Sequence, residues 1–311
     1  MMSERGFSQE AEIGKYPRRP ITYIIPTTPG ASADLVHRLI CKNAEKFLGQ
    51  PIVPKNEAGG KGIIGVLEFA RSKPDGYMLG YVTGSLIFVH PFFEKVPYDP
   101  VKDFTYIMQF GVMYMGIYVR ADSPFKTIQD LINYGRQNPK KLTFGAPART
   151  GFPYQVTQMI ASQENVQLTH IPFKQGPEVQ TAVLGGHVAF GAGDFSFSLL
   201  EAGQIRVLLL LKEESSAEYP QIPVLKDIGR GNTPAPLILQ VCGPKGMPEA
   251  LVKKIEDAFT KAMKEPDFIK GMKELRLPII YRNSRDLTDY VTRNSEVFAK
   301  FIRDQEKEGP K

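Results

Sequence analysis

The chain has 311 residues, of which 42% are hydrophobic and 23% charged, a composition close to that of ordinary globular proteins. This excludes a disordered, collagen-like or coiled-coil chain, and the length predicts two domains or one large α/β domain. The longest purely aliphatic run, at 207–211, is far shorter than the roughly 20 residues that span a membrane. Basic residues outnumber acidic ones by 39 to 33 but are scattered, which favours small anionic ligands and argues against nucleic acid.

The first fifteen residues, MMSERGFSQEAEIGK, are polar and mixed in charge, so we expect them to form a disordered leader outside the fold. They contain neither the apolar segment nor the small-residue cleavage site of a secretion signal. Taken alone, this start predicts a cytoplasmic protein, although a mature or recombinant form of a secreted protein would begin in the same way.

Between residues 21 and 82, short apolar runs alternate with helical patterns. The runs at 21–25, 52–54 and 77–82 predict strands. A helix is expected to open at Asp34 and to end at Gly49, and another follows the glycine-rich AGGKG. This order of strands and helices predicts a right-handed parallel sheet with helices packed on it.

The middle of the chain repeats this alternation and predicts a second α/β unit. Two later helices, from Pro248 and from Asp286, are expected to cover a sheet already built. The strands expected in the second unit are 113–119, 141–144, 167–172, 187–190 and 205–211, with helices at 127–137, 152–162, 177–186 and 196–201.

Two stretches rich in Pro, Gly and small polar residues, 118–124 and 230–237, separate the two units. A chain that leaves one lobe at the first stretch and returns at the second forms lobe 1 from 16–118 plus 236–311 and lobe 2 from 119–235. We therefore expect an α/β fold of two lobes with a hinge between them, which is the plan of a binding protein that closes on its ligand.

The glycine-rich segment contains G-x-G-x-x-G at Gly60, Gly62 and Gly65, a pattern also found in dinucleotide-binding proteins. Here the third strand ends without the acidic residue that would bind ribose, so the nucleotide interpretation is disfavoured. The alternatives are a helix start whose backbone approaches a ligand or a neighbouring loop, and a plain packing turn.

No motif assembles catalytic or metal-binding residues, so we expect no enzymatic activity, no cofactor and no metal. The chain lacks G-x-S-x-G, a GK[ST] phosphate loop and HExxH, and its four histidines are far apart. A catalytic triad formed by tertiary contacts stays open. Cys41 and Cys242 lie among apolar residues, which favours buried free thiols over a long-range disulfide.

Two loops of one kind follow a buried strand and precede a helix, one in each predicted lobe. They are PTTPGASA at 26–33 and GAPARTG at 145–151. The first turn of a helix has about four unpaired N–H groups and a partial positive charge, so such a loop can bind an anion. The pair predicts a shared site for an anionic ligand, and two ordinary βα turns are the alternative.

Several segments, in the same order, resemble the solute-binding proteins of tripartite tricarboxylate transporters, the Bug-type family. The resemblance spans about residues 16–305 and includes YPRRPITYIIPTTPGASADLVHRLI, LGQPIVPKNEAGGKGIIG, KPDGYMLGYVTGS, VPYDPVKDFTYI, KLTFGAP, HIPFKQGPEVQTAVLGGHV, AGQIRVLLLL and CGPKGMPEALVKKI. It implies a periplasmic receptor of the type II periplasmic-binding-protein (Venus-flytrap) fold, with its signal peptide removed or replaced. It also implies a small organic acid as ligand (a mono-, di- or tricarboxylate or an aromatic acid), delivery to integral membrane transporter subunits, and a monomer.

In this family the ligand carboxylate is held between the loop after the first strand and a loop of the second lobe, which implies a set of ligand-binding residues here. The second loop, GAPARTGFPY, departs from the family's G-S-A-G-x-G-S-x-x-H because it loses glycines and hydroxyls and gains Arg149. A guanidinium can hold a carboxylate by two hydrogen bonds, and an Arg149 that faces solvent or pairs within its own lobe is the alternative. The implied residues are Thr27, Thr28, Gly30, Ala31, Ser32, Asp34, Thr83, Ser85, Ala146, Arg149, Thr150 and Asp194.

The sequence therefore predicts a binding protein for a small organic carboxylate. An enzyme on a similar bilobal fold and a receptor that serves a signalling partner are the alternatives. The residues do not name the ligand.

Overall fold

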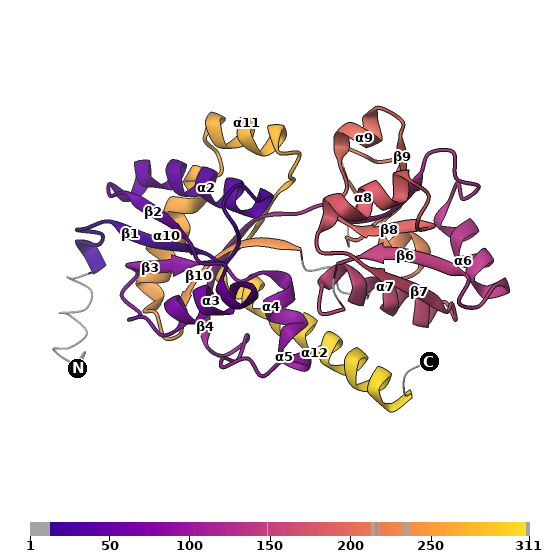
Figure 1. Cartoon of the computed structure of the whole chain (residues 1–311). Helices are drawn as coiled ribbons and strands as arrows, with labels where there is room; N and C mark the ends of the chain where they lie inside the picture. Colours follow the sequence, from indigo (N-terminus) through magenta and orange to yellow (C-terminus); the bar gives the residue numbers. More distant parts are fainter. Residues whose placement is uncertain are drawn as a thin grey trace. The chain divides into compact units, whose positions relative to one another are not determined.

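The computed structural model describes residues 13–147, 149–212, 215–216, 218–231, 233 and 237–308. The chain divides into two compact units, each with its own sheet (Figure 1). Unit 1 comprises Met1–Met113 and Ile238–Ser295, and unit 2 comprises Tyr114–Leu237 and Glu296–Lys311. The predicted α/β class is confirmed by these two mixed sheets flanked by helices.

The sheet of unit 1 has six strands in the order β11-β4-β10-β3-β1-β2. β1 pairs in parallel with β2 and β3, whereas β10 runs antiparallel to both β3 and β4, and β11 runs antiparallel to β4. The strands are β1 (Ile21–Ile25), β2 (Ile52–Asn56), β3 (Met78–Gly80), β4 (Phe104–Val112), β10 (Ile238–Pro244) and β11 (Ile279–Arg282).

The parallel pairing predicted for the strands at 21–25, 52–54 and 77–82 is therefore confirmed, and the sheet contains three further, antiparallel strands that were not predicted. β4, β10 and β11 were not expected from the sequence. β10 is buried along its whole length between β3 and β4, so it lacks the alternation of a half-exposed strand. The last part of the chain therefore adds strands to the sheet of unit 1, whereas only helices covering that sheet were expected there.

Helices pack on both faces of this sheet. α2 and the later helices α10 and α11 contact one another, and the core on their face includes Tyr23, Val36, Ile40 and Phe259. α3 packs against β1, β3 and β10. The helices of the unit are α2 (Ser32–Leu48), α3 (Ile63–Ala70), α4 (Gly84–Phe88), α5 (His90–Phe93), α10 (Glu249–Ala262), α11 (Pro266–Glu274) and the first part of α12 (Ser284–Glu308), with a 3-10 turn, η1 (Gly59–Gly62).

The end of α2 agrees with the sequence pattern and its start does not. Gly49 has φ 73° and terminates the helix, with its N–H bonded to the carbonyl of Glu45, as expected of a glycine at this position. The helix begins at Ser32, two residues before Asp34, because the Leu35 N–H already bonds to the carbonyl of Ala31.

The sheet of unit 2 has five strands in the order β7-β6-β8-β5-β9, with β6 parallel to β7 and β8 and with β5 antiparallel to β8 and β9. The strands are β5 (Gly116–Arg120), β6 (Leu142–Ala146), β7 (Leu168–Pro172), β8 (Phe190–Gly193) and β9 (Ile205–Leu210). The helices are α6 (Ile128–Gln137), α7 (Phe152–Gln163), α8 (Gly176–Leu184) and α9 (Phe197–Glu201), with a 3-10 turn, η2 (Leu225–Ile228).

The strand expected at 187–190 starts only at Phe190. After α8 the chain turns at Gly186, which has φ 70°, and the His187 N–H bonds back to the carbonyl of Ala182. This turn closes the helix and delays the strand.

The boundaries between the units differ from the predicted ones. The boundary expected after Tyr118 falls inside β5, which pairs along its length with β9, and the division lies at Met113 instead. The end of the chain from Glu296 belongs to unit 2, where Phe298 packs against Phe152 of α7. The boundary expected at 235/236, and part of the hinge segment 230–237, lie outside the described residues.

Residues 1–12 of the expected leader also lie outside the described residues. Ile13 packs against the core of unit 1, and the Lys254 ammonium donates to the carbonyl oxygens of Ile13 and Gly14, both at 3.0 Å. The Tyr16 N–H bonds to the carbonyl of Ile13 at 3.1 Å. Residues 13–15 are therefore part of the packed fold.

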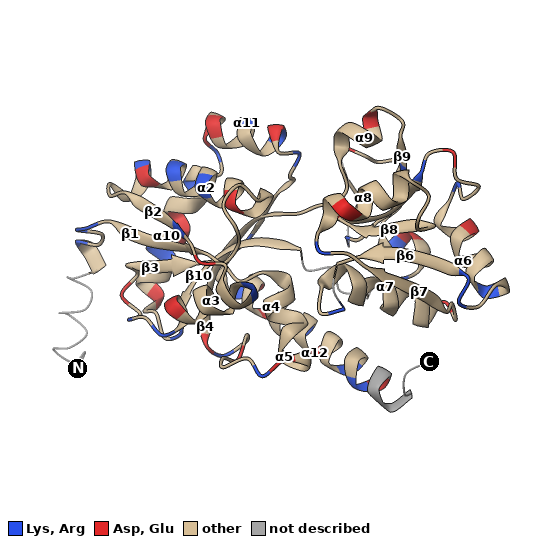
Figure 2. Ribbon diagram, in the orientation of Figure 1, with Lys and Arg blue, Asp and Glu red and all other residues tan. Residues whose placement is uncertain are grey.

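Basic and acidic residues are interspersed over the helices and loops in the view of Figure 2. None of the helices in the described ranges is long and apolar enough to cross a membrane. Cys41 and Cys242 are both buried free thiols, as the sequence favoured.

Candidate functional site

The first loop connects β1 to α2 in unit 1. Gly30 has φ 81°, a left-handed conformation that suits glycine, and no side chain caps the start of α2 at Ala31. Thr28, Gly30 and Ser32 are exposed, and Ala31 is half-buried. The loop therefore presents small residues beside an uncapped N-terminus of a 17-residue helix.

Asp34 lies beneath this loop and holds its shape. One carboxylate oxygen accepts the Gly30 N–H at 2.8 Å, and the other accepts Arg38 Nε at 2.8 Å and Asn56 Nδ2 at 2.9 Å. Asn56 Nδ2 also donates to the carbonyl of Thr27 at 3.0 Å. The network connects β2, α2 and both ends of the loop.

The charge on Asp34 is stabilised inside the protein. Its side chain is only 3% exposed, and burial by itself would raise the pKa of the carboxyl. The hydrogen bonds from Gly30, Asn56 and Arg38 and the charge of Arg38 outweigh burial and lower the pKa below its ordinary value. Both oxygens are thus engaged by the chain itself.

The residues predicted after the third strand lie at the start of α4. The Thr83 hydroxyl caps this helix by accepting the Leu86 N–H at 3.3 Å, and Ser85 is half-buried in its first turn. Thr83 is thus engaged as a helix cap.

The glycine-rich segment supports the first loop by close packing. A Cβ atom on Gly62, which has φ 93°, would lie 2.6 Å from the carbonyl oxygen of Pro26. Lys61 forms an ion pair with Glu94 and so fixes the segment to the end of α5. Of the interpretations left open by the sequence, a backbone that approaches a neighbouring loop fits this geometry.

The second loop connects β6 to α7 in unit 2, with Ala148 outside the described residues. Gly151 precedes α7 without a side-chain cap, and Gln155 Nε2 donates to the carbonyl of Arg149 at 2.8 Å. Gln155 is buried within α7, so the amide anchors the loop from inside the unit. Ala146 is buried at the end of β6, and Thr150 is half-buried.

Arg149 carries a charge that none of the described residues neutralises. Its side chain is exposed, and it forms no ion pair with any residue in the described ranges. Burial lowers the pKa of the neighbouring His170, and the positive charge of Arg149 lowers it further, so His170 is neutral at neutral pH. Arg149 thus stands as a free cation near the uncapped start of a 12-residue helix.

Asp194 follows β8, and although the residue as a whole is exposed, burial of its carboxyl raises the pKa of that group to about 6. A Cβ atom on Gly176 would lie 3.6 Å from its carboxylate oxygen, which places Asp194 beside the start of α8. In unit 2 the structure therefore positions Arg149 at one strand end and Asp194 at another.

Clusters of metal-binding side chains are not found in the described parts of the chain. No group of three or more His, Cys, Asp or Glu side chains that could hold a metal occurs there. His37 is buried against Tyr81, and His90 lies 3.7 Å from Glu94. The arrangement supports binding by loops and helix ends.

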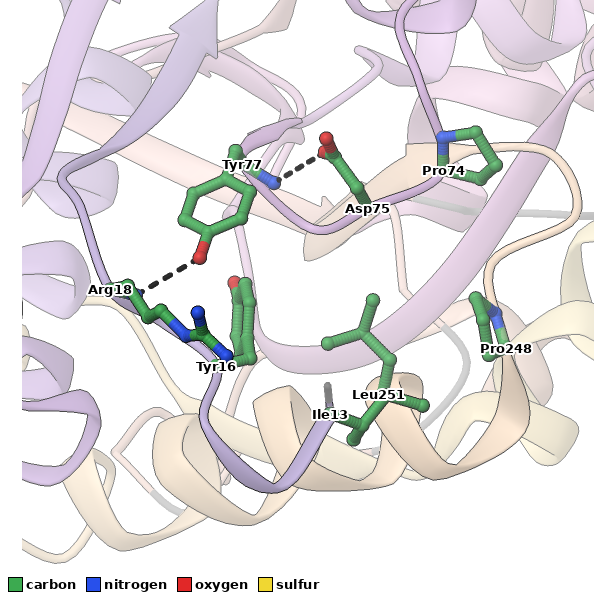
Figure 3. Close-up of a pocket in the computed structure, with 8 residues that line it drawn as sticks. All are labelled: Ile13, Tyr16, Arg18, Pro74, Asp75, Tyr77, Pro248 and Leu251. Atoms are coloured by element: carbon green, nitrogen blue, oxygen red, sulfur yellow. Dashed lines mark hydrogen bonds between the residues drawn. The ribbon is translucent and has the colours of Figure 1, made fainter. Parts of the chain in front are cut away.

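The cavity drawn in Figure 3 is separate from the predicted residues. It lies in unit 1, has a volume of about 310 Å³ and is lined by Tyr16, Arg18, Asp75, Tyr77 and Leu251 among others. Two hydrogen bonds join its lining residues: the backbone N–H of Arg18 donates to the Tyr77 hydroxyl, and the backbone N–H of Tyr77 donates to Asp75. None of the predicted site residues lines it.

Three positioning residues were missed by the sequence interpretation: Arg38, Asn56 and Gln155. Arg38 follows Asp34 at i+4, a spacing that puts both on one helix face, and Asn56 ends the strand parallel to β1. Both features can be recognised in the sequence, so Arg38 and Asn56 could have been predicted. For Gln155 the only signal is a polar residue on the buried face of α7.

Comparison with known proteins supports one family. The sequence profile of the tripartite tricarboxylate transporter family receptor, TctC, matches residues 36–306. The UPF0065 protein in gbd 5'region of Cupriavidus necator is 35% identical over 285 residues, which cover 90% of this chain and 86% of the relative. Protein BugT of Bordetella pertussis is 24% identical and covers 86% of this chain and 83% of its own.

Solved structures agree on the fold. A TctC solute binding protein from Polaromonas superposes with a TM-score of 0.82 at 21% identity and covers 93% of this chain and 100% of its own. Periplasmic binding protein BugD has a TM-score of 0.72 at 22% identity, covering 93% and 98%. Together with the profile and the Cupriavidus relative, these findings show that the chain belongs to the TctC family of tripartite tricarboxylate transporter receptors.

Proposed function

We propose that this protein is an extracytoplasmic receptor that binds a small organic carboxylate and delivers it to the membrane subunits of a tripartite transporter. The observation that carries the proposal is Arg149, an exposed cation without an ion-pair partner in the described residues, beside the uncapped start of α7. A guanidinium near a helix N-terminus is repelled by the helix dipole unless an anion is bound.

The first loop contributes backbone N–H groups and small side chains to the same ligand. Exposed Thr28, Gly30 and Ser32 lie where an anion could reach the start of α2. Asp34 and Thr27 act through the loop: the carboxylate of Asp34 is fully engaged, and the Thr27 hydroxyl is buried. The further residues proposed to line the site are Ala31, Thr83, Ser85, Ala146, Thr150 and Asp194.

The ligand class follows from charge and from the family. Two structures of the same fold were solved with a dicarboxylate: MatC from Rhodopseudomonas palustris with bound malate, and another R. palustris protein with adipate. We propose an acid of this kind for this chain, and the carboxyl of Asp194, whose pKa is raised to about 6 by burial, favours a ligand that also carries a hydroxyl or another donor.

Binding is proposed to act by closing the two units around the ligand. A micromolar affinity is worth about −8 kcal/mol, and two helix N-termini supply at most about 2 kcal/mol each. The guanidinium of Arg149, hydrogen bonds and burial of the ligand body must supply the remainder. Contacts available only in the closed form would shift the population towards it.

The proposed setting is the periplasm, with the receptor acting as a monomer and without chemistry of its own. Relatives of the same fold are described as periplasmic. Recovery of bound acid unchanged from the purified protein would separate this function from an enzymatic one.

A thermal-shift screen tests the proposal. Malate, adipate, citrate, acetate and benzoate would be compared with neutral sugars, because a ligand that binds only the native state raises the melting temperature. At least one acid should raise it, and Arg149→Ala should reduce that shift. If sugars raise the melting temperature and no acid does, the carboxylate assignment is wrong.

A further inference from the structure

Beneath the first loop, three buried polar atoms lack a hydrogen-bond partner among the described residues. They are Thr27 Oγ1, Tyr81 Oη and His37 Nε2. His37 is 0% and Tyr81 2% exposed, so bulk solvent does not reach their side chains. Buried polar groups are almost always hydrogen-bonded, and an ordered water is the usual partner when the protein supplies none.

These three atoms belong to one small region of unit 1. Tyr81 follows β3, and its N–H bonds to the carbonyl of Ile24 in β1, three residues before Thr27. The rings of His37 and Tyr81 are stacked with centroids 3.8 Å apart. The Thr27 hydroxyl lies near enough to the Tyr81 hydroxyl to act on it as a hydrogen-bonding group and so to oppose, in part, the rise in the tyrosine's pKa that burial causes, but the two oxygens do not meet the geometry of a direct hydrogen bond.

The hydrogen-bonding types of the three atoms match those that one water molecule can satisfy. His37 Nδ1 lies 3.3 Å from the carbonyl oxygen of Ala33, so Nδ1 carries the proton and Nε2 is an acceptor. Burial lowers the pKa of His37 to about 3, which keeps the ring neutral. A water can then donate to His37 Nε2 and to Thr27 Oγ1 while it accepts the hydroxyl proton of Tyr81.

We propose that one internal water joins Thr27, Tyr81 and His37 and thereby fixes the underside of the ligand loop to the core of unit 1. Thr27 is then a positioning residue: its hydroxyl faces inward, and it acts on the ligand only through the backbone of the loop. The water lies on the core side of the loop, so it is distinct from any water that touches the ligand. Its role in binding rests on the proposed function, whereas its presence does not.

A high-resolution crystal structure of the ligand-free protein tests the presence of the water. Density for one water within hydrogen-bond distance of all three atoms is expected in the wild type. It should be absent from Thr27→Val, which keeps the shape of the side chain, and from Tyr81→Phe. A wild-type structure without that density, or with the two hydroxyls bonded directly to each other, would overturn the proposal.

Calorimetric titration with malate and adipate tests the positioning role. Thr27→Val should weaken binding by about fivefold or more, because the loop loses its internal anchor. The matched control is Thr260→Val, which alters another buried threonine hydroxyl of unit 1 that meets no hydrogen-bond geometry among the described residues, but on α10. Equal affinities of the two variants would remove the positioning role. If neither acid binds the wild type, the ligand class given in the proposed function is wrong. The crystal structures still test whether the water is present.

Discussion

The two loops have the same place in their units, each between a buried strand and a helix, but they are held in different ways. The first loop is held by ionised groups, since Asp34 accepts hydrogen bonds from Gly30, Arg38 and Asn56. The second is held by one neutral amide, that of Gln155 on the carbonyl of Arg149. In the first loop the charges are neutralised internally, whereas in the second no described residue forms an ion pair with Arg149.

This difference distinguishes a residue that fixes the shape of its loop from a residue that can bind the ligand. A buried carboxylate that is fully hydrogen-bonded has no remaining attraction for a ligand, so Asp34 fixes the loop and leaves N–H groups exposed. An arginine without an acidic neighbour retains its attraction for an anion. The family resemblance implied that both Asp34 and Arg149 touch the ligand. Their hydrogen bonds and ion pairs within the chain favour ligand contact only for Arg149.

The largest effect is expected from Arg149 on binding. Arg149→Ala should weaken the affinity for the acid by about 2 to 4 kcal/mol, the cost of removing a charge-assisted hydrogen bond at a desolvated site. Arg149→Lys should recover only part of it because the planar fork is lost. Calorimetry measures both variants.

Arg71→Ala is the control, because Arg71 is an exposed arginine at the end of α3. It should leave the affinity unchanged. An Arg149→Ala protein within about threefold of the wild type would place Arg149 outside the site.

Asp34 should affect stability as much as binding. Asp34→Ala leaves Arg38 without its carboxylate and removes the acceptor of the Gly30 N–H, so we expect a loss of about 3 kcal/mol in the free energy of unfolding of unit 1. Urea unfolding measures it. Asp257→Ala, at an exposed i,i+4 pair with Lys253, should cost less than about 0.5 kcal/mol. Similar losses in the two variants would show that the network does not hold the loop.

His37 predicts a pH dependence in unit 1. The folded-state pKa is lowered to about 3 by burial, with the nearby Asp34 opposing the shift, while the unfolded value is near 6.5. The contribution of His37 to the free energy of unfolding is therefore complete above about pH 6.5 and is lost as the pH falls towards 3. Between about pH 7.5 and about pH 5 the wild type should lose about 2 kcal/mol more than His37→Phe, measured by urea unfolding. An equal loss in both proteins would mean that His37 accepts a proton in the folded state.

Gln155 should have the smallest effect. Gln155→Leu removes the hydrogen bond to the carbonyl of Arg149, so the unfolding free energy should fall by about 1 kcal/mol and the affinity for the acid a few-fold. Gln158→Leu in the same helix removes a hydrogen bond to the Tyr154 hydroxyl instead. We expect the affinity for the acid to be lower in Gln155→Leu than in Gln158→Leu. Equal affinities of the two variants would exclude Gln155 as a positioning residue.

The sequence predicted those elements whose pattern is local. The strand–turn–helix order at 21–49 and the C-terminal glycine of α2 follow from apolar spacing and from the left-handed conformation at Gly49. β10 could not be placed in this way, because it is buried along its length and its neighbours in the sheet, β3 and β4, are distant in sequence. A strand without an exposed face has no alternation, and the apolar run that would otherwise mark β10 is interrupted by the buried Gln240.

The predicted site shows the same limit. Small residues after a strand locate both loops, but whether a polar side chain faces a ligand or the chain depends on tertiary partners. Asp34 is an example, since its engagement by Asn56 requires β2 to lie beside β1. Arg149 is the converse, because its availability depends on the absence of an acid beside it among the described residues.

The central claim is that one carboxylate ligand contacts both loops. Backbone amide resonances of a ¹⁵N-labelled sample should be followed while the acid with the largest melting shift is titrated in. We expect the amides of Gly30–Ser32 and of Thr150–Phe152 to shift together and to fit one dissociation constant. Shifts confined to one loop, or separate constants for the two, would contradict the claim.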